Sequence, residues 1–125
     1  MGYLIIINYD LKIIRYKHNG NIERKEIGAA WNELLSLKEF TEKGYNLLTD
    51  YREGIFKFPV DDLSIIDDYL EQIKPILKGK KNAVIVDSPN EYAASVIVGL
   101  NKDIEMDYYV EVFSTEQAAL NFLKT

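Results

Sequence analysis

The C-terminal stretch from Glu111 to Leu123 joins a short β-strand directly to an amphipathic helix. Two potential capping residues follow the strand, and Ala119, Leu120 and Leu123 then recur along one helical face. A strand that leads into a helix with one apolar face is typical of a small α/β domain, in which the helix packs against the sheet. The stretch therefore indicates an architecture, and it contains no group arranged for catalysis.

Length and composition indicate one domain that needs no covalent crosslink. A chain of 125 residues, 47% of them hydrophobic, is long enough to bury a core of its own. The absence of cysteine excludes thiolate catalysis, Fe–S clusters and cysteine-rich zinc sites. The net charge of −5, with acidic residues along the whole chain, argues against nucleic-acid binding, which needs clustered lysine and arginine. We predict no cofactor and no metal.

The first apolar run, Tyr3–Tyr9, bears on the location of the protein. It is too short to span a membrane and no basic segment precedes it, so it fits neither a membrane span nor a signal peptide. A β-strand is the simpler interpretation. We therefore expect a cytoplasmic protein without a membrane span.

The N-terminal region is predicted to form a hairpin followed by a helix. Tyr3–Tyr9 and Lys12–His18 are rich in β-branched and aromatic residues, and the short interval between them permits only antiparallel pairing. The Asn19-Gly20-Asn21 sequence is expected to end the second strand. From Ile22 to about Phe40, apolar residues recur at helical spacing and predict one helix with a buried face.

Strands and helices are then predicted to alternate. The third strand begins at Tyr45, ends near Tyr51 and is followed by an irregular segment that contains Gly54, with a short edge pairing at Ile55–Phe58 as an open alternative. A second helix has Pro75 in a loosened last turn, and Asn82–Asp87 is typical of a strand buried on both faces.

The last predicted elements follow the same pattern. Ser88, Pro89 and Glu91 match the start of a third helix, the fifth strand is Tyr108–Phe113, and Ser114 or Thr115 caps the final helix. The order β-β-α-β-α-β-α-β-α predicts an α/β fold with a mixed, mainly parallel five-stranded sheet, in one domain covering residues 1–125.

Three segments in this order resemble the SpoIIAA-like branch of the STAS superfamily. They are YNLLTDYRE at 45–53, VIVDSPNEYA at 84–93 and VFSTEQAALNFL at 112–123. The resemblance covers nearly the whole chain. It implies a SpoIIAA/STAS-like domain that acts as a non-enzymatic binding or regulatory module, in a branch whose many bacterial members mostly have no assigned activity.

The chain departs from the STAS pattern at one position. STAS phosphorylation switches use a serine or threonine at the start of the helix after the third strand, where a phosphate is stabilised by the helix dipole. Between Tyr51 and Leu63 there is no such residue, and Ser64 would lie within the helix. The phosphorylation site is therefore not transferred to this chain.

Asp50 and Arg52 are the first candidate site residues. They leave the third strand at its carboxyl end, where parallel sheets tend to bind ligands. One interpretation makes Arg52 an anion or carboxylate clamp oriented by Asp50. The favoured interpretation makes them a structural ion pair that holds the following loop.

Ser88 and Tyr92 are the second candidate pair, at the end of the next strand beside Asp87. A helix that begins at Ser88 could bind an anion at its N-terminus, although the cap and Glu91 would satisfy the same donors.

Other polar residues have structural interpretations. His18, the single histidine, is expected to be an exposed residue at a strand end. Lys78, Lys80 and Lys81 are expected to form a solvated turn, because the spacing of a phosphate loop is absent. Tyr108 and its neighbour should point to opposite faces of a strand.

Three functions remain open. The first is a STAS-like module with an unidentified protein partner that forms a homodimer, because helices expected on a single sheet face would leave the other face uncovered. The alternative is that the hairpin and the last helix fold over that face. The second is a carrier of a small apolar ligand or lipid, of the type found in the CRAL-TRIO architecture. The third is an enzyme that uses Asp50, Arg52 and Ser88.

Overall fold

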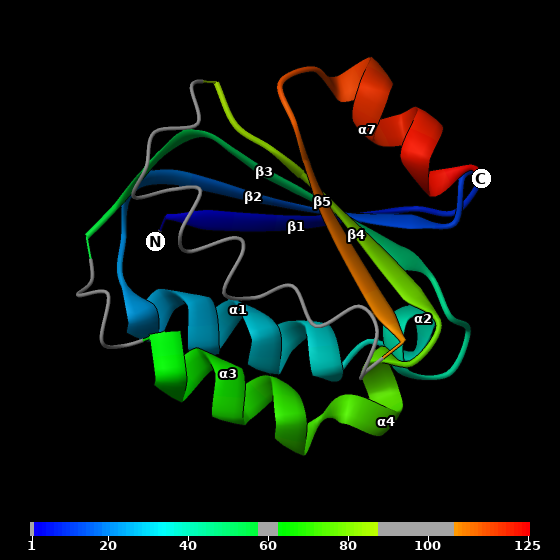
Figure 1. Ribbon diagram of the computed structural model, residues 1–125, viewed down its shortest axis with the longest axis horizontal. Coiled ribbons are helices and arrows are strands. Elements are labelled where there is room, and N and C mark those ends of the chain that lie inside the picture. The colour runs from blue at the N-terminus through cyan, green and yellow to red at the C-terminus, as the bar shows by residue number, and fades with distance from the viewer. Residues whose placement is uncertain (1, 58–62, 88–106) are drawn as a thin grey trace.

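The computed structural model describes residues 2–57, 63–87 and 107–125 (Figure 1). The elements are β1 (Tyr3–Asn8), β2 (Ile13–Ile22), α1 (Arg24–Leu35), α2 (Lys38–Thr41), β3 (Asn46–Phe56), α3 (Leu63–Gln72), α4 (Lys74–Leu77), β4 (Lys80–Ile85), β5 (Tyr108–Phe113) and α7 (Glu116–Leu123).

The sheet has five strands in the order β1-β2-β3-β4-β5. β1 pairs antiparallel with β2, and each of the other neighbouring pairs is parallel. The predicted hairpin and the mixed, mainly parallel sheet are confirmed. The helix predicted to begin at Ser88 lies outside the described residues.

Helices cover both faces of the sheet, so the expectation that they lie on a single face is wrong. The alternative, in which the last helix folds over the other face, is confirmed for that helix. Figure 1 shows α1, α3 and α4 on one side of the sheet and α7 on the other. We call these the α1/α3 face and the α7 face. α7 packs mainly on β3, β4 and β5.

The Asn19-Gly20-Asn21 sequence does not end β2, and the irregular segment predicted after Tyr51 is also absent. β2 and β3 instead continue as a parallel pair from Asn19 opposite Glu53 to Ile22 opposite Phe56. The pairing shifts in register after Lys17, and Gly20 adopts a φ of +71°, so the strand continues through the Asn19-Gly20-Asn21 sequence. Pairing with β3 outweighs the local preference for a turn.

Each of the first two predicted helices is divided. α1 ends at Leu35, where the Ser36 hydroxyl donates to the Glu33 carbonyl at 2.6 Å, and α2 follows separately. α3 ends before Ile73, and Pro75 lies in the first turn of α4, where its missing N–H removes no helical hydrogen bond. The predicted loosening near Pro75 is confirmed.

The C-terminal elements are closest to prediction. β4 is almost entirely buried, although it begins and ends two residues before the predicted strand. β5 has the predicted bounds, with Tyr108 buried and Tyr109 40% exposed on the opposite face. Thr115 caps α7 by accepting a hydrogen bond from the Ala118 N–H at 3.2 Å.

Among the described residues, two buried clusters lie between the sheet and its helices. The larger lies between the α1/α3 face and its helices and contains most of the aromatic side chains. The smaller lies beneath α7 and consists of Ile13, Leu48, Ala83, Ile85, Ala119 and Leu123.

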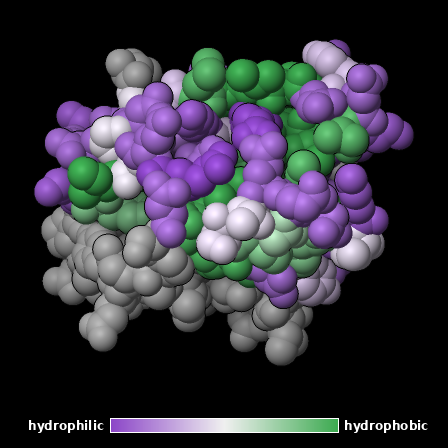
Figure 2. All heavy atoms as spheres, turned by 90° about the horizontal axis from the view of Figure 1, so that it is seen from above, coloured by the Kyte–Doolittle hydropathy of each residue, from purple (hydrophilic) through white to green (hydrophobic). Residues whose placement is uncertain are grey.

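β1 contributes to only one of these clusters. Tyr3, Ile5 and Ile7 pack against the larger cluster, so the alternation of the strand places Leu4 and Ile6 on the α7 face. α7 does not cover them, and they are 54% and 50% exposed. Figure 2 views the molecule from the α7 side and shows apolar atoms along one edge beside a band of hydrophilic residues.

Candidate functional site

Asp50 and Arg52 lie within β3, so the prediction that they leave the strand at its carboxyl end is wrong. They meet on the α7 face of β3, because residues two apart on a strand share a face. The Asp50 side chain is only 2% exposed. The Arg52 guanidinium donates from Nε to Oδ1 at 3.0 Å and from Nη2 to Oδ2 at 2.7 Å. The Arg52 backbone N–H also donates to Oδ1 at 3.0 Å. The pair is thus bidentate with a third, local hydrogen bond.

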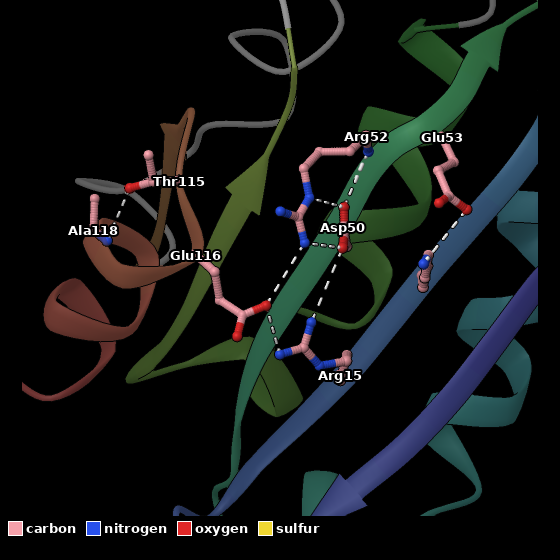
Figure 3. Close-up of polar contacts among 8 residues, drawn as sticks. Arg15, Asp50, Arg52, Glu53, Thr115, Glu116 and Ala118 are labelled. Atoms are coloured by element: carbon pink, nitrogen blue, oxygen red, sulfur yellow. Dashed lines mark hydrogen bonds and ion pairs between the residues drawn. The ribbon is translucent and has the colours of Figure 1, made fainter.

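Arg15 of β2 and Glu116 of α7 extend this pair into a network of four residues (Figure 3). The Glu116 carboxylate lies 2.9 Å from Arg15 Nη2 and 3.6 Å from Arg52 Nη2. Arg15 Nη1 lies 4.0 Å from Asp50 Oδ2. We call Arg15, Asp50, Arg52 and Glu116 the Asp50 network. Its charges alternate in sign and connect three elements.

Local sequence rules place the two outer members of the network. The alternation of β2 buries Ile14 and Tyr16 on the α1/α3 face, so Arg15 faces α7. Thr115 caps α7 and makes Glu116 its first residue. A carboxylate is favoured there because it lies at the positive end of the helix dipole.

The pKa of Asp50 lies below its ordinary value. Burial alone would raise it, because a buried carboxylate loses its hydration. The hydrogen bonds from the Arg52 side chain and backbone, with the charges of Arg52 and Lys17, outweigh this effect. The hydrogen bond to Asp50 correspondingly raises the pKa of Arg52.

This electrostatic state limits what the network can do chemically. A carboxylate that stays ionised and accepts three hydrogen bonds is a poor general base near neutral pH. The planar fork of Arg52 is engaged by Asp50, so an incoming anion would have to compete for it. The arrangement is suited to holding the start of α7 against β2 and β3. Both interpretations of the pair, structural and ligand-binding, stay predictions.

Ser88 and Tyr92 lie outside the described residues. The anion site predicted at Ser88 and the constellation of Asp50, Arg52 and Ser88 therefore also stay predictions. Within the part of the chain that the structure describes, no cluster of histidine and acidic residues has the arrangement of a metal site. None of the described helices is long and apolar enough to cross a membrane.

The prediction that His18 is exposed is wrong. His18 is fully buried on the α1/α3 face, where its Nε2 is hydrogen-bonded to the Tyr16 hydroxyl and its ring lies near Tyr3 and Tyr51. Burial lowers the pKa of His18 to about 4, so the imidazole is neutral at physiological pH. Among the described residues, its Nδ1 has no hydrogen-bond partner.

The predicted solvated turn is wrong for two of its three lysines. Lys80 is buried, its ammonium donates to the Ile76 carbonyl and lies 5.0 Å from the centre of the Phe40 ring. Lys81 donates to the Thr125 hydroxyl at 2.9 Å. Both lysines belong to β4, and their long aliphatic stems let them pack while the ammonium reaches a polar partner.

Arg15 and Glu116 were not identified as site residues from the sequence. A signal for Arg15 existed, because the alternation from Ile14 to Tyr16 places it on the same face as Lys17. Glu116 carried the signal of an acidic residue immediately after a cap. Their meeting at Asp50 required the placement of α7, which local patterns do not supply.

The comparisons with known proteins agree with this architecture. The structure of an uncharacterized protein from the DUF3478 family of Shewanella loihica PV-4, described as having a SpoIIAA-like fold, superposes with a TM-score of 0.65. The alignment covers 98% of this chain and 94% of that protein at 14% identity. No family model matches the chain, and no curated protein matches it by sequence. The chain has a SpoIIAA-like fold, as the sequence resemblance implied.

Proposed function

We propose that this protein is a non-enzymatic binding or regulatory module, located in the cytoplasm, that works by protein association. The observation that carries the proposal is the open part of the α7 face, where Leu4 and Ile6 are exposed beside the Asp50 network. The low pKa and full hydrogen bonding of Asp50 also suit a structural network better than a reaction centre. The comparisons favour neither a lipid carrier nor an enzyme.

The arrangement of this surface resembles that of a protein interface. Leu4 lies opposite Lys17 and Ile6 opposite Arg15 in the β1–β2 register. Lys17 and Arg15 are themselves paired with acidic residues, at 3.4 Å and 2.9 Å. Apolar side chains bordered by paired charges have the layout of an interface core with a polar rim.

We assign a second copy of the chain as the partner. Among the described strands, β1 is an edge strand that pairs only with β2. Its six residues include no proline and no charge, the features that usually prevent edge pairing. With a twofold axis at Ile5, antiparallel pairing would place Leu4 of each copy opposite Ile6 of the other. The exposed apolar side chains would then cover one another on the same face.

Sedimentation at tens of micromolar tests this proposal, because association depends on concentration. We expect the wild-type protein to sediment as a dimer and Ile6→Lys as a monomer. Ile55→Lys is the matched control, since Ile55 is also an exposed isoleucine on a strand, at 57%, and this variant should remain dimeric. A monomeric wild-type protein, or equal effects of the two substitutions, would overturn self-association through β1.

A further inference from the structure

A cavity of about 130 Å³ lies between the α1/α3 face and helices α1 and α3. Its floor is formed by side chains of β2, β3, β4 and β5, and its roof by side chains of the two helices. The Asp50 network lies on the α7 face, so the cavity is separate from the surface around Leu4 and Ile6. The cavity therefore offers a distinct site.

Five aromatic side chains contribute to the lining of the cavity. Tyr16, Tyr51 and Tyr108 belong to the sheet, and Trp31 and Tyr69 to the helices. The rings of Tyr16 and Tyr51 meet edge to face, with centroids 6.3 Å apart and an interplanar angle of 75°. Aromatic walls of this kind favour a planar aromatic guest, which can present its edge or face to each ring.

A buried hydrogen-bonded chain forms the polar part of the lining. The Thr49 hydroxyl donates to Asn82 Oδ1 at 2.6 Å, and Asn82 Nδ2 donates to the Tyr108 hydroxyl at 3.0 Å. These bonds use the donor of Thr49 and a lone pair of Tyr108. Each hydroxyl has a further hydrogen-bonding function, an acceptor on Thr49 and a donor on Tyr108. Such a chain can bind one hydroxyl group of a guest.

The size of the cavity restricts the guest to a single ring. An apolar cavity of about 150 Å³ in another protein binds benzene, so a volume of about 130 Å³ matches one six-membered ring and excludes a lipid acyl chain. Gly28 of α1 borders this space, and a Cβ added there would meet no atom within 4 Å. Glycine is a poor helix former, and at this position it keeps the cavity open.

We propose that the cavity binds a small, uncharged aromatic molecule with one hydroxyl group. The uncharged class follows from the lining, which is mainly aromatic and aliphatic with neutral hydrogen-bonding groups. Arg24 borders the cavity but already interacts with another group. This inference goes beyond the proposed function and does not rest on it.

Phenol is the first probe, and Trp31 reports its binding because it is the only tryptophan of the chain and lines the cavity. We expect a saturable change in Trp31 fluorescence and a rise in melting temperature with phenol. Toluene has the same shape without the hydroxyl and should bind several-fold more weakly. No saturable response to phenol would overturn the proposal, and tighter binding of toluene or benzoate would overturn the assigned chemical class.

Gly28→Leu is the variant that fills the cavity, and it should remove the saturable response while keeping the helical signal in circular dichroism. Unchanged phenol binding by folded Gly28→Leu would show that the site lies elsewhere. If this variant does not fold, nuclear Overhauser effects between phenol and the Trp31 indole of the wild-type protein decide the question. Their presence supports the site, and their absence at saturating phenol overturns it.

Discussion

The two faces of the sheet are held to their helices by different chemistry. On the α1/α3 face, a large cluster of aliphatic and aromatic side chains lies between the sheet and its helices. Within the sheet, Tyr51 also meets Tyr16 and Phe56 edge to face. Burial raises the pKa of Tyr16, Tyr51 and Tyr108, so their hydroxyls stay protonated. On the α7 face, a smaller apolar cluster is supplemented by the Asp50 network.

This difference follows from the alternation of β2 and β3. Ile14, Tyr16 and His18 face one side, whereas Arg15 and Lys17 face the other. One layer is therefore held by a large apolar area, whose contribution depends little on salt. The other combines a short helix with charges, whose interactions are screened by salt when they are exposed. We infer that the α7 layer is the more easily perturbed of the two.

Neighbouring leucines of β3 provide the largest test of this comparison. Leu47 belongs to the larger cluster and Leu48 to the cluster beneath α7, and both are fully buried. Leu47→Ala should lower the free energy of unfolding by about 2–5 kcal/mol. Leu48→Ala should cost less, because α7 is a short helix on the smaller cluster and can move toward the vacated space. Urea unfolding of both variants measures this, and a larger loss for Leu48→Ala would contradict the inferred ranking.

The pH dependence of stability tests the α1/α3 face, where His18, the single histidine of the chain, is buried. The pKa of His18 in the folded protein is about 4, below its ordinary value of 6.5, because burial disfavours the charged form. The unfolded state therefore binds the proton more readily. Stability should be complete above pH 6.5 and fall as the pH is lowered toward 4, with a slope approaching about 1.4 kcal/mol per pH unit.

His18→Phe removes this titration and is the comparison for the pH experiment. The variant should lack the loss of stability between pH 6.5 and 4, whatever its stability at neutral pH. Asp50 acts in a more acidic window, since its lowered pKa contributes stability above its ordinary value of 3.8 that is lost below it. Equal slopes for wild-type and His18→Phe protein between pH 6.5 and 4 would show that His18 is not the titrating group.

Most of the layered architecture could be predicted because it depends on local patterns. Helix-capping preferences narrowed the cap of α7 to Ser114 or Thr115, of which the structure has Thr115, and strand alternation predicted the opposite orientations of Tyr108 and Tyr109. The burial of His18 was also encoded, since it continues the alternation of Ile14 and Tyr16. The error came from treating a polar side chain at a predicted strand end as solvated.

The remaining features depend on contacts between distant segments. The continuation of β2 through Gly20 requires β3 as its partner, so local turn propensity gives the wrong answer. The Asp50 network requires Glu116, which reaches Asp50 and Arg15 only after α7 has packed on the sheet. Asp50 and Arg52 could be predicted as a pair because a strand places residues two apart on the same face.

The smallest expected effect concerns the α7 face. It distinguishes the buried Asp50–Arg52 pair from the more exposed Lys17–Glu53 pair. Asp50→Asn keeps the shape of the side chain but removes its negative charge. The carboxylate oxygens of Asp50 accept three hydrogen bonds from Arg52. We expect a loss of about 1.5–3 kcal/mol in the free energy of unfolding. Glu53→Gln removes the more exposed pair with Lys17 and should cost only about 0–1 kcal/mol. Urea unfolding at low and high salt distinguishes the two variants, because salt should weaken the Lys17–Glu53 pair more than the buried Asp50–Arg52 pair.

If Asp50→Asn were as stable as the wild-type protein, the Asp50–Arg52 pair would not hold α7 to the sheet, and the ligand-binding interpretation of Arg52 would gain support.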